Sequence, residues 1–508
     1  MDKILKNKIV ATSLILIIII FITNLLLIFF SHKKEKIVIA EIKDDLTENY
    51  LNYIDKPSWI TNQALRLIIP PLIDYQHNCY PYSEILKQIP SKDNNLMFLE
   101  NKQTVMIIDQ KNFQTDKINV TNIIPTIQIL NMENISAKWI HKNLVDSIDQ
   151  IDQTQENEIR IRYKLAYSLP YFPSPVIFDN PELHKEQILN YTYKNIKNFS
   201  IFPKYSDYEL LKSQTNSFII KSKKKEQEIH FITYTNIENL KKDIKKIDLI
   251  KIPPKIEQYL TKYIQKDYEI MKLPNKEIFF IFFNPQLKKE ERLIIYLTIK
   301  NELSKYNITD YKLNNTYILP YHFAAIEMYT PQKSIKPLPE NNNKKLKIMI
   351  TYKDEKSKLI SNLLEEIVSK KFNSELFKIN IEEQLPKKEI FGVLVEPPET
   401  SIKDDINPYN FDLIITSVTF LPYMNYFLIY SKDGKYNIYS ISTPKIEELL
   451  NKVMSGFSLD QKYYLIELQK ELSNQFLIVP LLIDTQTLLI KKDKIDHIKI
   501  NPINVNLE

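Results

Sequence analysis

The chain has 508 residues, of which 44% are hydrophobic and 26% charged, as in ordinary globular proteins. Its formal charge of +6 comes partly from lysines that flank the first apolar stretch, and the remaining body is too nearly neutral to indicate a nucleic-acid-binding protein. The length predicts several packed units. The single cysteine, Cys79, excludes an intramolecular disulfide and any cysteine-cluster metal site.

The first feature along the chain is an apolar run at residues 9–30 that contains neither charge nor proline. As a helix it rises about 33 Å, enough to cross the hydrocarbon core of a bilayer. We therefore predict a transmembrane anchor at residues 9–30, a cytoplasmic tail at residues 1–8 and an extracytoplasmic body at residues 31–508. Lysines on the two sides nearly balance, so the positive-inside rule favours this orientation only slightly.

A cleaved signal peptide is the alternative interpretation of residues 9–30. Such peptides have a shorter apolar core and a small-x-small cleavage site. Here the core is longer, no such site follows it, and no lipid-attachment cysteine is present. These features favour an uncleaved anchor in the inner membrane, with the body in the periplasm.

Up to the boundary at Pro253-Pro254, apolar spacing and turn residues predict a mixed series of elements. They comprise strands at 37–40, 104–109, 158–165, 218–220, 229–234 and 247–250, and helices at 60–69, 136–148 and 236–244. Strands 218–220 and 229–234 are expected to form a hairpin around the lysine run at residues 221–225.

After that boundary the chain alternates more regularly between helix and strand. We predict helices at 256–264, 288–303, 357–371, 445–454 and 460–475, and strands at 277–283, 345–350, 377–381, 411–418, 476–483 and 485–490. Residues 331–343 are a polar, proline-rich linker, after which a β-α-β unit begins. The order indicates an α/β protein whose strands are buried on both faces.

Motifs that carry chemistry are absent from the sequence. The three glycines lie too far apart in the sequence to form either phosphate-binding loop. The seven histidines show no paired spacing. No Gly-x-Ser-x-Gly occurs, and Cys79 lacks the surroundings of a nucleophile. We therefore predict no catalysis, no cofactor and no metal site.

Five stretches, in order, resemble segments of the extracytoplasmic solute-binding proteins of family 5, the peptide-, dipeptide- and nickel-binding components of ABC importers. They are residues 65–87, residues 135–148, the strand 278–284 with Glu291-Arg292-Leu293, the strand Phe411-Asp412-Leu413-Ile414-Ile415, and residues 468–482, which end in Ile478-Val479-Pro480-Leu481.

This resemblance implies a two-lobed, periplasmic-binding-protein-like fold whose lobes are discontinuous in sequence. Lobe I would hold residues 37–62, 155–252 and 476–508, with residues 63–154 as an inserted subdomain, and lobe II would hold residues 253–475. A small solute or peptide would bind between the lobes, which close by a hinge. The implied partners are the permease and ATPase subunits of an ABC importer.

The ligand segment departs from the family pattern. Where peptide receptors carry Trp-x-x-Asp, this chain has Val418-Thr419-Phe420-Leu421, so the acid that pairs with a peptide's amino end is missing. We predict that Ser417, Val418, Phe420 and Leu421 face the space between the lobes, and that Tyr423 and Asn425 supply polar contacts. The cleft would then be more apolar than that of a peptide receptor.

The same departures leave a second class open, a membrane-tethered interaction or structural protein on a degenerate binding fold without a ligand. A membrane-bound hydrolase is a third class, supported only by carboxylates that no motif brings together.

Overall fold

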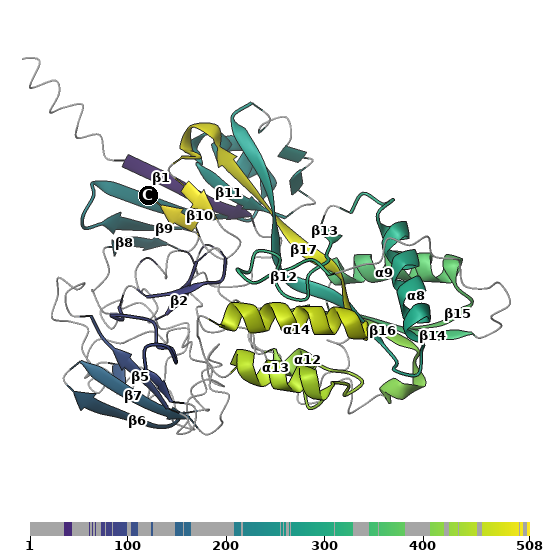
Figure 1. Cartoon of the computed structure of the whole chain (residues 1–508). Coiled ribbons are helices and arrows are strands. Elements are labelled where there is room, and N and C mark those ends of the chain that lie inside the picture. Colours follow the sequence, from purple (N-terminus) through teal and green to yellow (C-terminus); the bar gives the residue numbers. More distant parts are fainter. Residues whose placement is uncertain are drawn as a thin grey trace, which may run out of the picture.

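The computed structural model describes residues 35–42, 60, 63, 67, 73–98 (without 77 and 84), 103–109, 123–124, 148–163 (without 156), 208–328 (without 215, 216, 254, 255, 258, 261–263, 265 and 309), 345–380 (without 354), 407–420, 426–454 (without 435), 460–500 (without 497) and 505–507. Within them the strands form one large sheet and three small ones (Figure 1).

The large sheet contains segments from both ends of the chain. Its strands are β1 (Glu35–Ile42), β8 (Tyr208–Gln214), β9 (Ser217–Ser222), β10 (Gln227–Tyr234), β11 (Leu249–Ile252), β12 (Tyr268–Phe283), β13 (Tyr311–Leu313), β14 (Leu346–Tyr352), β15 (Ser374–Asn380), β16 (Leu413–Thr419) and β17 (Ile478–Lys491). Their spatial order is β15-β14-β16-β12-β17-β11-β1-β10-β9-β8, with β13 paired to β17. Strands β12 and β17 therefore join the two halves of the sheet.

Helices cover the sheet or connect its strands. They are α6 (Ile237–Asp243), α8 (Lys289–Leu303), α9 (Glu355–Lys371), α12 (Phe427–Tyr430), α13 (Pro444–Met454) and α14 (Gln461–Gln475), with 3-10 turns η4 (Ile244–Lys246), η5 (Pro408–Asn410) and η6 (Lys492–Lys494). None of the helices in the described residues is both long and apolar enough to cross a membrane. The predicted anchor, residues 9–30, lies outside them.

In the half of the sheet around β1, strands β10 and β11 flank β1 on its two sides and run parallel to it. Asn236 caps α6, since its side chain accepts a hydrogen bond from the Glu238 amide at 2.7 Å, and α6 returns the chain between the two parallel strands. The predicted β9–β10 hairpin is confirmed, because the two strands pair antiparallel.

The half of the sheet around β14 contains the predicted β-α-β unit. Strand β14 pairs parallel with β15 and with β16, and α9 connects β14 to β15. Antiparallel pairing of β16 with β12 then attaches this unit to the crossing strands. The predicted elements at 288–303, 445–454 and 460–475 are confirmed as α8, α13 and α14.

Several predicted strands differ from the structure in their bounds, most of all at β17 and β12. Residues 476–483 and 485–490 form one strand, β17, because Asp484 is accommodated inside the sheet and does not mark a turn. Strand β12 begins at Tyr268, nine residues before the predicted start at Glu277, because its first part pairs with the end of β17. Charged residues interrupt the apolar pattern there, so periodicity does not reveal this part of the strand.

A separate four-stranded sheet consists of β4 (Met97–Phe98), β5 (Gln103–Ile107), β6 (Ile148–Gln155) and β7 (Glu158–Tyr163), in the order β4-β5-β7-β6. The predicted boundary between residues 154 and 155 falls inside the β6–β7 hairpin, and pairing places β7 with β5 and β6. The predicted helix at 136–148 lies outside the described residues except for Ile148, which begins β6.

The two remaining small sheets are hairpins. One joins β2 (Asp74–Tyr75) to β3 (Pro81–Tyr82), and the other joins β18 (Ile498–Ile500) to β19 (Val505–Leu507). The predicted linker at 331–343 lies outside the described residues. The other lobe boundaries stay predictions.

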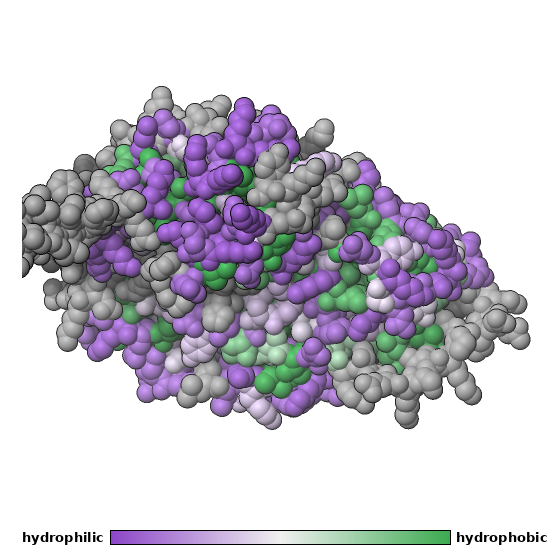
Figure 2. Space-filling view, turned by 90° about the horizontal axis from the view of Figure 1, so that it is seen from above, coloured by the Kyte–Doolittle hydropathy of each residue, from purple (hydrophilic) through white to green (hydrophobic). Residues whose placement is uncertain are grey.

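Apolar side chains form separate clusters on the two halves of the large sheet. Two clusters cover the opposite faces around β1, one containing Ile37 and Ile39 and the other Val38 and Ala40. A larger cluster surrounds the other ends of β12 and β17 and extends to the four-stranded sheet. Hydrophilic residues dominate the outer face seen in Figure 2. The crossing strands are the element that the clusters share.

Candidate functional site

The candidate site is the point where β12 and β17 pass from one half of the sheet to the other. Strand β17 is apolar at both ends but carries four consecutive polar residues in its middle, Asp484 to Thr487, each no more than 5% exposed. The ladder between the two strands shifts register between Pro274 and Ile278, opposite this polar segment. Buried polar groups require partners, so the partners of this segment define the site.

Asp484 replaces the backbone partners that the register shift removes. One of its carboxylate oxygens accepts the Glu277 amide at 2.8 Å, and the other accepts the Asn275 side-chain amide at 2.8 Å. The ammonium of Lys356 lies 3.2 Å from the same carboxylate. Because Asp484 is only 4% exposed, these bonds compensate for removing its charge from water.

A second ion pair lies beside the first. The Lys353 ammonium is 2.9 Å from the buried carboxylate of Glu277 and donates to the hydroxyl of Thr419 at 3.3 Å. The side chains of Lys353 and Lys356 are 35% and 29% exposed. Lys353 lies between β14 and α9, and Lys356 lies in the first turn of α9, so the start of this helix is tied to the crossing strands.

Aromatic groups enclose the cluster. The Lys356 ammonium lies 4.8 Å from the ring centroid of Tyr311, in cation–π geometry. The hydroxyl of Tyr321 donates to the Asn275 carbonyl at 3.3 Å, and burial raises the pKa of that hydroxyl well above its ordinary value. The Tyr321 hydroxyl therefore acts as a neutral hydrogen-bond donor.

The turn between β2 and β3 packs on the loop around Phe323. Cys79 lies in this turn with φ 62°, in the left-handed region, and is 2% exposed. Its neighbour Asn78 accepts the Phe323 amide at 2.7 Å, while the Tyr80 and Phe323 rings meet edge to face. Burial raises the pKa of the Cys79 thiol, so it is held protonated and unreactive.

The predicted site residues divide into two groups. Val418 and Phe420 are 3% and 0% exposed and pack in the larger apolar cluster, where the Phe420 ring lies 5.8 Å from that of Phe280. Ser417 is half-buried on the other face of β16. The other three predicted residues, Leu421, Tyr423 and Asn425, lie outside the described residues, so the ligand site as a whole stays a prediction.

Sequence reasoning missed the residues that form the polar cluster. Lys353 and Lys356 are far from Asp484 in the chain, and the three residues match no motif. The available signal was the polar interruption of an apolar run after Ile483, which we interpreted as a break between two strands. Strand alternation also places Thr419, rather than Val418 or Phe420, beside Lys353.

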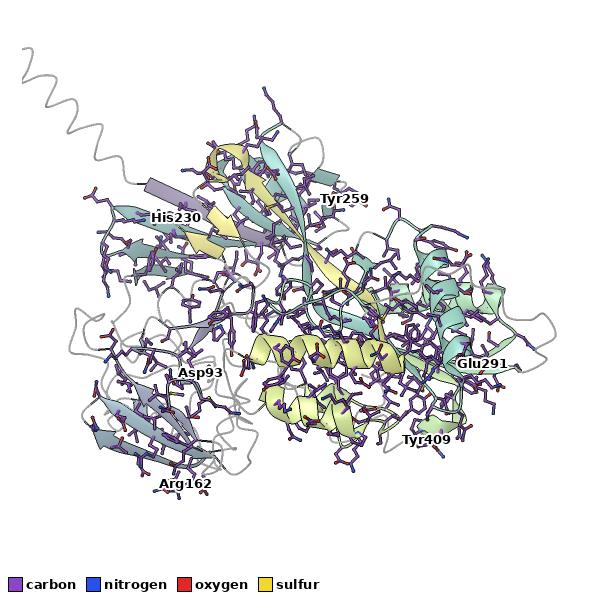
Figure 3. All side chains as sticks on the ribbon, in the orientation of Figure 1. Asp93, Arg162, His230, Tyr259, Glu291 and Tyr409 are labelled. Atoms are coloured by element: carbon purple, nitrogen blue, oxygen red, sulfur yellow. The ribbon has the colours of Figure 1, made fainter. Side chains whose placement is uncertain are left out.

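Two polar residues of the segments that resemble the family, Asp412 and Asn284, have structural partners. Asp412 accepts the Lys347 amide at 2.9 Å and so joins β16 to β14. The Asn284 side chain donates to the Phe411 carbonyl at 2.9 Å. Arg292 is 8% exposed, and two of its guanidinium nitrogens have no hydrogen-bond partner among the described residues. Figure 3 labels the neighbouring Glu291 on α8, at the opposite side of the molecule from Arg162 on β7.

Metal chemistry finds no support in the geometry. No group of three or more histidine, cysteine, aspartate or glutamate side chains in the described part of the chain could hold a metal ion. His322 is buried and accepts the Ala324 amide through Nδ1 at 3.2 Å, and burial lowers its pKa to about 3. It is a neutral structural residue at physiological pH.

Comparison with known proteins identifies the fold. No family model and no curated protein sequence matches the chain. Among solved structures, the unliganded open form of the periplasmic murein tripeptide binding protein MppA is similar with a TM-score of 0.66, covering 94% of this chain and 98% of that one at 14% identity. HbpA2 from Haemophilus parasuis also gives a TM-score of 0.66, covering 93% of this chain and 100% of that one at 9% identity.

A third similar structure contains a ligand. The oligopeptide-binding protein AppA from Bacillus subtilis, in complex with a nonapeptide, gives a TM-score of 0.54, covering 94% of this chain and 99% of that one at 8% identity. At these identities the comparisons show the fold alone. The chain has the two-lobed α/β fold of family 5 solute-binding proteins, as the sequence resemblance implied.

Proposed function

We propose that this chain is the extracytoplasmic solute-binding component of an ABC importer, anchored in the inner membrane by residues 9–30. The ligand is a peptide or a similar small solute held between the two lobes. The observation that carries the proposal is the similarity of fold over nearly the full length of both chains. The permease and ATPase subunits would be its partners, and it would perform no catalysis.

The polar cluster at the crossing strands gives this proposal a mechanism. In a two-lobed receptor the lobes move about the strands that connect them. Asp484 and Glu277 lie where β12 and β17 cross, and their lysine partners come from the residue before α9 and from its first turn. We propose that this cluster keeps the crossing point rigid while the ligand is captured beside it, with Ser417, Leu421, Tyr423 and Asn425 on the side of lobe II.

Ligand-dependent stability tests the proposal. A ligand at about 100 times its dissociation constant adds about 2.7 kcal/mol to the free energy of unfolding. We would measure thermal unfolding of the purified full chain against libraries of short peptides, amino acids and metal chelates. A reproducible, saturable increase in Tm supports a receptor.

The position of the ligand segment has its own test. Leu421→Asp restores a carboxylate where peptide receptors hold the ligand's amino end, so the variant should favour peptides with a free amino terminus over N-acetylated ones. Phe377→Asp is the matched control for adding a charge, because the Phe377 side chain on β15 is 37% exposed. An unchanged peptide preference in a folded Leu421→Asp protein would remove this assignment.

The second candidate is an interaction protein that keeps the fold without binding a solute. It is favoured by the burial of Val418 and Phe420 and by the loss of the acid at position 421. A chain of this kind would give no Tm increase with any library, and cross-linking in membranes would capture a protein partner instead of transporter subunits.

A further inference from the structure

Lysine-rich turns from distant parts of the chain meet at one end of the large sheet, the edge at which β1 begins and β17 finishes. Because β1 and β10 are parallel and Glu35 pairs with Gln227, the turn before β10, which contains Lys223, Lys224 and Lys225, lies at the start of β1. All three lysines are exposed. The lysine run is therefore placed where the chain enters the body.

A second turn reaches the same edge from the other neighbour of β1. Strand β11 is parallel to β1, with Ile39 opposite Leu249, so the preceding turn η4 lies level with the first residues of β1. Its exposed lysines are Lys245 and Lys246.

A third turn follows the end of β17. This strand is antiparallel to β11, with Ile490 opposite Leu249, so η6 and its exposed Lys492 lie at this edge too. Figure 1 shows the start of β1, the hairpin β9–β10 and the end of β17 at the upper left of the molecule, and Figure 3 labels His230 on β10 nearby. We call Lys223, Lys224, Lys225, Lys245, Lys246 and Lys492 the lysine edge.

Three acidic groups at this edge are engaged within the protein. Asp248 is buried and accepts the Val38 amide at 2.8 Å, Asp243 pairs with Lys246 at 2.8 Å, and Glu228 lies 3.5 Å from His230. The exposed acids beside the lysines are Glu226, Asp267, Asp493 and Asp496. The six lysines of the edge outnumber these four acids, so the edge presents a net cationic surface.

We propose that the lysine edge binds the anionic headgroups of the membrane into which residues 9–30 insert, and so orients the body on that membrane. The inference rests on the proposed anchor. Phe30 and Glu35 are five peptide steps apart, at most about 18 Å, so an anchor ending at Phe30 holds this edge close to the lipid surface. Lysines bind an anionic surface when they come within a Debye length, about 10 Å at 0.1 M salt.

The test uses the full-length protein reconstituted into vesicles that contain a headgroup quencher. Cys79 is buried, so a thiol introduced by Glu226→Cys can be labelled selectively beside the lysine edge. Tyr463→Cys, at a side chain 60% exposed on α14, is the matched probe away from the edge. Vesicles are made either of phosphatidylcholine alone or with phosphatidylglycerol.

The expected result is stronger quenching of the Glu226→Cys probe with phosphatidylglycerol than with phosphatidylcholine, and no such difference for the Tyr463→Cys probe. Each lysine near an anionic surface shifts the docked equilibrium by roughly five-fold. Reversal of Lys223, Lys224 and Lys225 to glutamate, or 1 M salt, should therefore reduce the quenching to its phosphatidylcholine value.

The outcomes separate this inference from the proposed anchor. If the protein floats with both vesicle types but the Glu226→Cys probe is quenched equally in each, the lysine edge does not bind lipid and the inference is overturned. Equal effects of phosphatidylglycerol on both probes would also overturn it. If the protein fails to float with phosphatidylcholine vesicles, the anchor itself is absent, and the inference that rests on it falls with it.

Discussion

The two parts of strand β17 are equally buried but differ in chemistry. The difference distinguishes the residues that stabilise the fold from those that specify how its two halves are arranged. Residues 478–483 are apolar and pack against the phenylalanines of β12, whereas Asp484 to Thr487 are polar and occupy the crossing point. Apolar packing stabilises without specifying direction, while hydrogen-bonded charges specify a unique arrangement at little net gain in stability. The first part holds the half-sheet together, and the second determines how the halves join.

The largest expected effect on stability is in β12, where it packs against the apolar part of β17. Phe280 is fully buried between Phe282 and Phe420, so Phe280→Ala removes its contacts and leaves a cavity, at a cost of about 4 kcal/mol in the free energy of unfolding. Urea denaturation measures it. Phe98→Ala, at a ring 41% exposed, is the control and should change stability by less than about 0.5 kcal/mol. Equal losses in both variants would contradict the comparison.

In the polar part, Asp484→Ala leaves Lys356 and the Glu277 amide without their partner, and we expect a loss of about 3 kcal/mol. Asp484→Asn keeps an acceptor for the amide and should lose less. A double-mutant cycle with Lys356→Met isolates the ion pair, and Asp433→Ala, at an exposed aspartate, is the control. Additive effects of the Asp484 and Lys356 substitutions would show that the pair is not coupled.

Lowering the pH should reduce the free energy of unfolding through His322, which lies in the loop beside the crossing strands. Burial lowers the pKa of His322 to about 3 from an ordinary 6.5, so the unfolded chain takes up a proton in this window and the native chain does not. The burial of neutral His322 therefore does not lower the free energy of unfolding above pH 6.5. As the pH falls from 6.5 toward 3, it lowers the free energy of unfolding by about 1 kcal/mol per pH unit. Urea midpoints of wild type and His322→Gln between pH 4 and 7 measure it. Parallel pH profiles would show that another group is responsible.

The smallest effect is expected at the partly exposed pair. Lys353→Met breaks the contact with Glu277, and since Lys353 is 35% exposed we expect a loss of about 1 kcal/mol. Lys370→Met, which breaks an exposed pair with Glu366, should lose less than Lys353→Met, because water screens the exposed charges. Chemical denaturation in low and high salt compares the two. If the control loses more, burial does not determine the strength of these pairs.

Prediction from sequence succeeded where the apolar pattern is local. The buried run before Asn284, the helix from Lys289 and the β-α-β unit from Leu346 all follow from spacing that one element determines by itself. The site could not be predicted to the same degree. Val418 and Phe420 pack in the larger apolar cluster, Phe420 beside Phe280, and their spacing in sequence does not distinguish a core from a ligand cleft.

The sequence by itself determined several of the strands and helices, the α/β class and, through a resemblance, the fold. Only the tertiary structure decided that Asp484 continues a strand, that Lys353 and Lys356 reach the crossing, and that lysines 225, 245 and 492 lie at one edge. The physical reason is that side-chain periodicity records whether a residue is buried, whereas strand pairing between distant segments decides what it is buried against.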